Sequence, residues 1–76
     1  MQAYSTPTTS THFTRMLTKP ETQDILKALR KRDDMEVSKV TGGYSVLDNE
    51  GQLVLRAMIG TRGYLVRFNK GWFNAD

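Results

Sequence analysis

Strand-forming sequence, interrupted at short intervals by glycine, dominates the second half of the chain. Residues 35–70 read MEVSKVT-GG-YSVLD-NEG-QLVLRAMIG-TRG-YLVRFN, and all six glycines of the protein fall in or just after this stretch. Apolar residues that alternate with polar ones between glycine-rich breaks are typical of antiparallel strands joined by tight turns. The pattern therefore predicts an antiparallel meander of three to four strands.

A helical pattern precedes these strands. The residues that make its apolar stripe are Ile25, Leu26, Ala28 and Leu29. Thr18, with Glu21 three residues later, has the form of a capping box, but Lys19 is an alternative cap position, because the residue before Pro20 avoids helical angles. We expect a helix over about residues 20–32 that packs on one face of the sheet, which makes an α+β fold.

The first 17 residues differ from the rest of the chain. The segment STPTTST has no apolar side chain, so residues 1–17 are interpreted as a flexible Ser/Thr-rich arm, disordered to about residue 10. Phe13, Met16 and Leu17 are expected to pack on the body of the protein. Residues 18–76 then form a single small α+β domain.

Two short loops set trial registers for the hairpins. Residues 49–51 and 61–63 are interpreted as three-residue loops with Gly51 and Gly63 at positive φ. The resulting pairs are Leu47 with Leu53, Val46 with Val54, Ile59 with Leu65, Met58 with Val66, and Arg56 with Phe68.

Because side chains alternate along a strand, these registers divide the sheet into two faces. The face interpreted as a plain core, which the helix would cover, collects Leu47, Leu53, Leu55, Ala57, Ile59 and Leu65. The second face collects Tyr44, Val46, Val54, Arg56, Met58, Tyr64, Val66 and Phe68. Leu29 and Leu55 are expected to be buried between helix and sheet. The second face would then need another cover: residues 13–17, Trp72 with Phe73, or a second copy of the chain.

Composition limits the classes of protein that fit. A chain of 76 residues without cysteine has neither a disulfide framework nor a thiolate metal site. No apolar run approaches the length of a membrane span, and the N-terminus lacks the apolar region of a signal peptide. We therefore expect a cytoplasmic protein without a membrane partner.

Basic residues are distributed unevenly. Within the net charge of +3, Arg56, Arg62, Arg67 and Lys70 lie in a stretch, residues 52–75, that contains no acid. A secondary basic patch, on the helix, consists of Lys27, Arg30 and Lys31. Such a chain can present one basic face, which suits an anionic partner.

Residues suited to enzyme chemistry are sparse. His12 is the only histidine and lies in the predicted arm, so no Ser-His-Asp arrangement is indicated. Asp33, Asp34 and Glu36 form a carboxylate cluster, but no histidine or further acid has the spacing of a metal ligand around them. We expect a protein that is not an enzyme and has no catalytic residue, metal or cofactor.

The second face offers a binding hypothesis. It combines flat aromatic rings with guanidinium groups, as single-strand-binding proteins do. The candidate residues for binding nucleic acid or another partner are Tyr44, Arg56, Arg62, Tyr64, Arg67, Phe68 and Lys70. We expect a small binding protein for an anionic partner, with nucleic acid favoured. One alternative is a protein–protein inhibitor or adaptor, such as a phage- or mobile-element-type regulator of a larger host protein, in which a homodimer is also considered. A third is sequestration of a small phosphorylated ligand between subunits.

Overall fold

The computed structural model describes residues 11–74, which form one helix and five strands. In chain order the elements are β1 (His12–Leu17), α1 (Lys19–Arg30), β2 (Met35–Val40), β3 (Gly43–Asp48), β4 (Leu53–Ile59) and β5 (Tyr64–Asn69).

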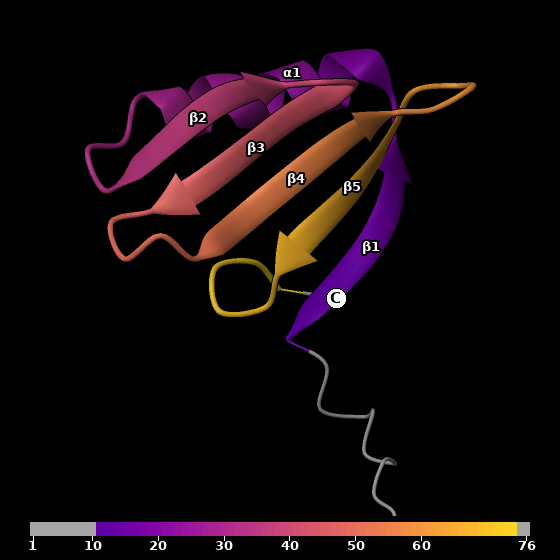
Figure 1. The fold of residues 1–76 in the computed structure, drawn as a ribbon. Helices are drawn as coiled ribbons and strands as arrows, with labels where there is room; N and C mark the ends of the chain where they lie inside the picture. The colour runs from indigo at the N-terminus through magenta and orange to yellow at the C-terminus, as the bar shows by residue number, and fades with distance from the viewer. Residues whose placement is uncertain (1–10, 75–76) are drawn as a thin grey trace, which may run out of the picture.

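The strands form one antiparallel sheet in the order β1-β5-β4-β3-β2 (Figure 1). Strands β2 to β5 are the predicted meander. Helix α1 carries the chain from β1 at one edge to β2 at the other edge, and it packs on one face of the sheet, where it contacts β2 and β5. The predicted α+β class, with the helix on one face, is confirmed.

The sheet has one strand more than predicted, because the last part of the expected arm is ordered. His12–Leu17 pairs along its full length with β5, and Phe13 stacks on Phe68 with ring centroids 5.0 Å apart. The backbone N–H of Lys70 also donates to the carbonyl of Thr11 at 2.9 Å. The rest of the predicted arm, residues 1–10, lies outside the described part of the chain.

The helix begins where the capping box predicted. Thr18 is the N-cap, with extended backbone (φ −72°, ψ 165°), and its hydroxyl accepts from the backbone N–H of Glu21. The Glu21 carboxylate in turn accepts from the backbone N–H of Thr18 at 2.9 Å. The helix ends at Arg30, two residues earlier than expected. Immediately after it, Arg32 donates two hydrogen bonds to Asp34, both at 2.9 Å, within the turn that leads to β2.

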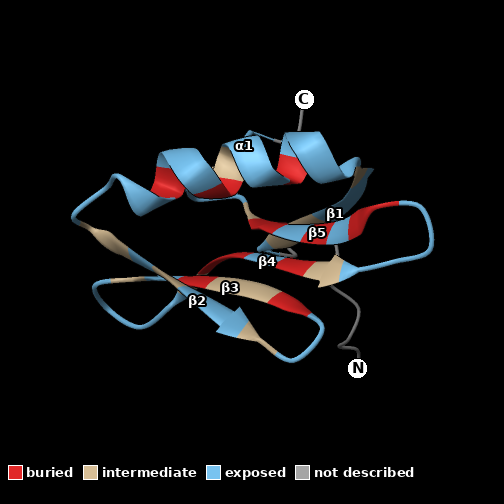
Figure 2. Cartoon of the chain, turned by 90° about the horizontal axis from the view of Figure 1, so that it is seen from above, coloured by how far each residue is buried: buried red, intermediate tan, exposed pale blue. Residues whose placement is uncertain are grey.

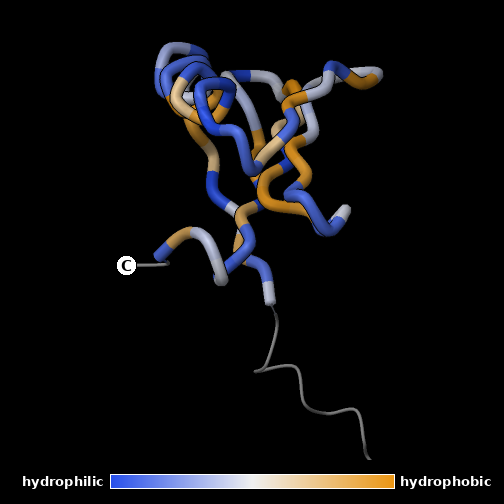
Figure 3. Tube along the Cα trace, turned by 90° about the vertical axis from the view of Figure 1, so that its left-hand side faces the viewer, coloured by the Kyte–Doolittle hydropathy of each residue, from blue (hydrophilic) through white to orange (hydrophobic). Residues whose placement is uncertain are grey.

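The core lies between α1 and the sheet. In Figure 2 the buried residues of the helix and of the central strands face one another across this layer. Figure 3 shows that hydrophobic stretches lie mainly along the strands, whereas the helix is largely hydrophilic apart from its inner stripe. The buried apolar residues are Leu26, Leu29, Val46, Val54, Leu55, Ala57, Tyr64, Val66 and Phe68. The predicted burial of Leu29 and Leu55 is therefore confirmed.

The predicted register of β4 and β5 is wrong by one residue. Ile59 pairs with Tyr64 instead of Leu65. Gly60 donates its N–H to the carbonyl of Gly63 at 2.7 Å, so the hairpin closes with a two-residue loop rather than a three-residue loop. Because a shift of one residue moves side chains to the opposite face of the sheet, the predicted faces are exchanged for β5.

The pairing of β3 with β4 agrees with the prediction at Leu47 and Leu53, and then departs from it. A β-bulge at this point pairs Val46 with Leu55 instead of Val54. Val54 is the extra residue of the bulge, and both Val54 and Leu55 are completely buried. A bulge allows two successive side chains to turn towards the same layer, which strict alternation does not allow.

These two shifts decide which residues form the core. Leu47, Ile59 and Leu65, predicted to lie in the core, are 40%, 61% and 48% exposed. Val46, Val54, Tyr64, Val66 and Phe68 of the predicted second face are buried in the cluster that contains the helix residues Leu26 and Leu29. The helix thus covers a face that combines these residues with Leu55 and Ala57 of the predicted core.

The two hairpin glycines both have positive φ, but glycine is needed at the two positions for different reasons. Gly51 has φ 80°, in the left-handed region that a non-glycine residue avoids. Gly63 has φ 158°, close to extended backbone, and is buried. A Cβ atom at Gly63 would collide with the carbonyl oxygen of Leu17, so the close approach of β1 requires glycine there.

Candidate functional site

The side of the sheet turned away from α1, here called the open face, carries the candidate site. The strand registers place a row of hydrogen-bonding side chains across it, one from each strand: Thr14, Arg67, Arg56, Ser45 and Ser38. The next row is apolar: Met16, Leu65, Met58, Gly43 and Val40. The open face therefore combines a polar row with an adjacent apolar row.

Arg56 and Arg67 lie directly opposite one another on β4 and β5. Both are exposed, and neither forms an ion pair or hydrogen bond with any residue that the structure describes. Like charges directly opposite on neighbouring strands destabilise a sheet, although solvation keeps the repulsion small at exposed positions. An anion bound between the two guanidinium groups would convert this repulsion into attraction.

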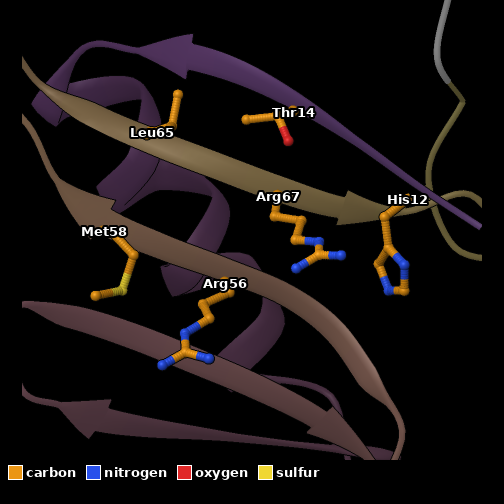
Figure 4. A pocket seen from close by; sticks show the side chains of 6 residues that line it. All are labelled: His12, Thr14, Arg56, Met58, Leu65 and Arg67. Atoms are coloured by element: carbon orange, nitrogen blue, oxygen red, sulfur yellow. The ribbon is translucent and has the colours of Figure 1, made fainter.

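The two arginines border a partly open depression of about 490 Å³. Its lining comes from three strands: His12 and Thr14 of β1, Leu65 and Arg67 of β5, and Arg56 and Met58 of β4. Figure 4 shows the Arg56 and Arg67 side chains extending from neighbouring strands, with Arg67 between Arg56 and His12. The lining contains no carboxylate, so its electrostatic potential favours anions.

His12 lies at the rim of the depression, where its Nδ1 atom is 2.8 Å from the Thr11 hydroxyl. Asn69, opposite His12 on β5, donates through its side chain to the carbonyl of Leu53 at 2.7 Å. These contacts hold polar groups in place at one end of the open face.

The apolar row adds exposed hydrophobic surface beside the arginines. Met16 is 60% exposed and Leu65 is 48% exposed, while Met58 is half-buried between the neighbouring strands. Leu47, on the same face, is 40% exposed. The site can therefore make apolar contacts as well as ionic ones.

The aromatic residues predicted to act with these arginines lie on the other face. Tyr64 and Phe68 are 6% and 5% exposed in the core beneath α1. Tyr44 is half-buried on the same side, with its ring centroid 6.4 Å from that of Tyr64. The structure thus separates the predicted stacking surfaces from Arg56 and Arg67, and the candidate site has to be reassigned without them.

The other predicted basic residues are spread around the molecule. Arg62 lies in the β4–β5 turn and Lys70 follows β5, so both flank the sheet at opposite ends of β5. The secondary patch, formed by Lys27, Arg30 and Lys31, is exposed at the end of α1 and lies in the other layer. The Arg30 guanidinium lies 5.8 Å from the centre of the Tyr44 ring. Only Arg56 and Arg67 of the predicted residues share the open face.

Thr14, Ser45 and Leu65 are site residues that the sequence interpretation did not identify. A two-residue loop between Gly60 and Gly63 would have paired Arg56 with Arg67 and placed Leu65 beside Met58. The sequence does not distinguish that loop length by itself, because glycine at both 60 and 63 suits either loop.

Three carboxylates lie together away from the arginine pair, whereas Glu36, opposite Leu47, is on the open face at the β2 edge of the sheet. Asp34, Asp48 and Glu50 line a small depression of about 210 Å³ together with Trp72. The hydrogen bonds donated by Arg32 lower the pKa of Asp34 below its ordinary value, so this carboxylate stays ionised. The Arg32 guanidinium also lies 5.3 Å from the centre of the Trp72 ring. The depression beside Arg56 and Arg67 is therefore the basic part of the open face.

No group of three or more histidine, aspartate or glutamate side chains within residues 11–74 is arranged to hold a metal ion. The helix of this part of the chain has 12 residues and is too short and polar to cross a membrane.

Comparisons of the chain with models of protein families, with curated proteins and with solved structures found no match.

Proposed function

We propose that the protein is a non-catalytic nucleic-acid-binding protein that contacts its ligand through the open face. The observation that carries this proposal is the pair formed by Arg56 and Arg67, opposed on neighbouring strands and without an acidic partner among the described residues. Guanidinium groups bind phosphate oxygens through charge-assisted, bidentate hydrogen bonds. An exposed arginine pair at the edge of an open depression is well suited to a phosphate backbone.

The extent of the polar row favours a polymer over a small phosphorylated ligand. Five strands spaced about 4.8 Å apart give a row about 19 Å long, which matches the rise of about five or six base pairs. The depression at this row is only partly enclosed, whereas a small ligand is usually surrounded by its pocket. Thr14 and Ser45 can donate to phosphate or sugar oxygens on either side of the arginines.

A protein partner is the second candidate, and the exposed apolar row favours it. Met16 and Leu65 present hydrophobic surface beside Arg56, and arginine, methionine and apolar side chains are common in protein interfaces. In this reading the protein is an inhibitor or adaptor of a larger protein. A face-to-face homodimer is less favoured, because it would bring the arginine pairs of two copies together.

The test is fluorescence anisotropy with labelled oligonucleotides over a range of salt concentrations. Two phosphate contacts predict a slope of log affinity against log salt of about −1.4 for single strands or about −1.8 for duplexes. Arg56→Gln and Arg67→Gln should each reduce the slope by about one contact. Lys27→Gln, which removes one charge from the exposed surface of the helix layer, is the matched control.

Binding that is undetectable at low salt would overturn the proposed function and promote the protein partner. Equal weakening by Lys27→Gln and Arg56→Gln would also contradict it, because binding would then depend on net charge instead of on the open face.

A further inference from the structure

We infer that the protein pairs with a second copy of itself through β1, which joins two sheets into one and brings two arginine pairs onto one surface. The pairing can be tested without nucleic acid, whereas the use of the joined surface rests on the proposed function. Strand β1 forms one edge of the sheet, and no other described strand lies beyond it (Figure 1). An open strand edge is a template for pairing with another chain.

The hydrogen bonding of β1 shows which of its backbone groups are directed outward. The N–H of Lys70 donates to the carbonyl of Thr11, and this bond continues the β1–β5 register by one residue. Facing residues in an antiparallel pair alternate between those that exchange hydrogen bonds and those that do not. Counting from Thr11, the N–H and C=O groups of Thr14 are therefore directed away from β5, and so are those of Met16.

These outward groups favour one two-fold register, with Thr14 opposite Thr14 of the second copy. The two threonines then exchange both of their backbone hydrogen bonds, and Met16 lies opposite His12 of the second copy. A shift of two residues in one direction would oppose Arg15 to Arg15, and like charges that face each other destabilise a sheet. A shift in the other direction would leave only residues 12–14 of β1 paired.

The side chains are compatible with this register. Phe13, which packs against the core on the helix side, lies opposite Arg15 of the second copy. Within one copy the Arg15 guanidinium is 5.5 Å from the centre of the Phe13 ring, and a guanidinium group over an aromatic ring is attracted to it. On the open face the two Thr14 side chains meet, and pairs of threonines stabilise antiparallel strands. The register therefore opposes no like charges.

The other edge of the sheet is less suited to pairing. Strand β2 carries Glu36 and Lys39 on opposite faces, and charged side chains on an edge strand hinder its pairing with another chain. In β1, Arg15 is the only lysine, arginine, aspartate or glutamate. Met16 of β1 is 60% exposed, so pairing would also cover apolar surface.

Pairing in this register extends the proposed binding surface. The polar row Arg56, Arg67 and Thr14 of one copy continues into Thr14, Arg67 and Arg56 of the other. A two-fold axis perpendicular to the sheet keeps both rows on the open face. The two Arg67 residues are then three strand spacings, or about 14 Å, apart, which exceeds the Debye length of about 10 Å at 0.1 M salt. A polymer with many phosphates can span this distance, whereas a single small anion cannot.

The first measurement is sedimentation velocity of the full chain, without nucleic acid, from low micromolar to near-millimolar concentration. Strands of six residues bury less area than the roughly 1,200–2,000 Å² of a stable interface, so we expect a reversible dimer that forms in the micromolar range.

Cysteine cross-linking tests the register, because the chain contains no cysteine of its own. Thr14→Cys places the two thiols at the two-fold axis, where facing Cα atoms are about 5.5 Å apart, within the range of a disulfide. Met16→Cys is the matched control on the same strand and face, but its two thiols are at least about 13 Å apart. Under mild oxidation, Thr14→Cys should form the covalent dimer at least tenfold faster than Met16→Cys.

Proline variants test the edge. Thr14→Pro removes an N–H that is directed away from β5, so it should abolish the dimer while thermal unfolding stays cooperative. Lys39→Pro is the matched control at the β2 edge. The carbonyl of Gly42 accepts from the N–H of Ile59 at 2.8 Å, and alternation from this bond directs the N–H of Lys39 away from β3. Lys39→Pro should leave the dimer intact.

The outcomes distinguish this inference from the proposed function. A full chain that is monomeric at every concentration, equal cross-linking of the two cysteine variants, or loss of the dimer in Lys39→Pro instead of Thr14→Pro would overturn the pairing through β1. Dimerisation only after deletion of residues 1–10 would also overturn it, because that segment would then cover the edge. Each of these results leaves the proposed function intact. A β1-paired dimer that binds no oligonucleotide would overturn the proposed function and leave the pairing in place.

Discussion

Truncation of Leu55 to alanine tests the assignment of the core. Leu55 is completely buried at the centre of the sheet, opposite Val46 on one neighbouring strand and Phe68 on the other. Removing the equivalent of three methylene groups costs about 2.4 kcal/mol at about 0.8 kcal/mol each, and the residual cavity raises the total to about 3–4 kcal/mol. A domain of 76 residues has a total stability of only about 4–11 kcal/mol, so the loss should be large.

Leu65→Ala is the matched control, because the same side chain is removed from the neighbouring strand β5 on the open face. Leu65 is 48% exposed, so its truncation should cost less than about 1 kcal/mol. Urea unfolding followed by circular dichroism measures both losses. In thermal unfolding, Leu55→Ala should lower Tm by at least about 12 °C and Leu65→Ala by less than about 8 °C. Equal losses for the two variants would refute the assignment of the faces.

Two further predictions concern local structure. Gly63→Ala should destabilise the protein strongly, because the added Cβ would collide with the carbonyl oxygen of Leu17. Gly60→Ala is the control, because its Cβ would meet only an ordinary contact of 3.6 Å. Comparable unfolding midpoints for the two variants would contradict the close approach of β1. Hydrogen bonds donated by the backbone and hydroxyl of Thr18 lower the pKa of Glu21 below its ordinary value of 4.5. The ionised Glu21 carboxylate therefore stabilises the fold above about pH 4.5, and this stabilisation is lost as the pH falls through the lowered pKa. Glu21→Gln should therefore be less stable than the parent at pH 6, with the difference shrinking at pH 3, and an unchanged difference would exclude the ionised capping box as its cause.

Local signals in the sequence predicted the elements that depend on neighbouring residues. Thr18 and Glu21 identified the start of the helix, because a capping box needs only residues three positions apart. Gly51 identified its turn, because positive φ is a property of one residue. The order of helix and meander followed from these elements, and so did the α+β class.

Features that depend on distant residues were predicted less well. The strand formed by His12–Leu17 is stabilised by pairing with β5, far along the chain, and its own composition does not show this partner. The β4–β5 register depended on whether the loop contained two residues or three, and the wrong length moved Tyr64 and Phe68 to the wrong face. The candidate site therefore kept Arg56 and Arg67 from the sequence interpretation but lost its aromatic residues.

The pairing of β1 with β5 also decides how the molecule responds to force. His12 pairs with Asn69, and the hydrogen bond between Lys70 and Thr11 lies just beyond them, so both ends of the described chain leave the same end of this strand pair (Figure 1). Tension applied to those two ends would break the backbone hydrogen bonds one after another, as a zipper opens. Tension between Thr11 and the β4–β5 turn would load the same bonds together in shear. The domain should be mechanically weak along the line that joins its own ends and much stronger along the strands.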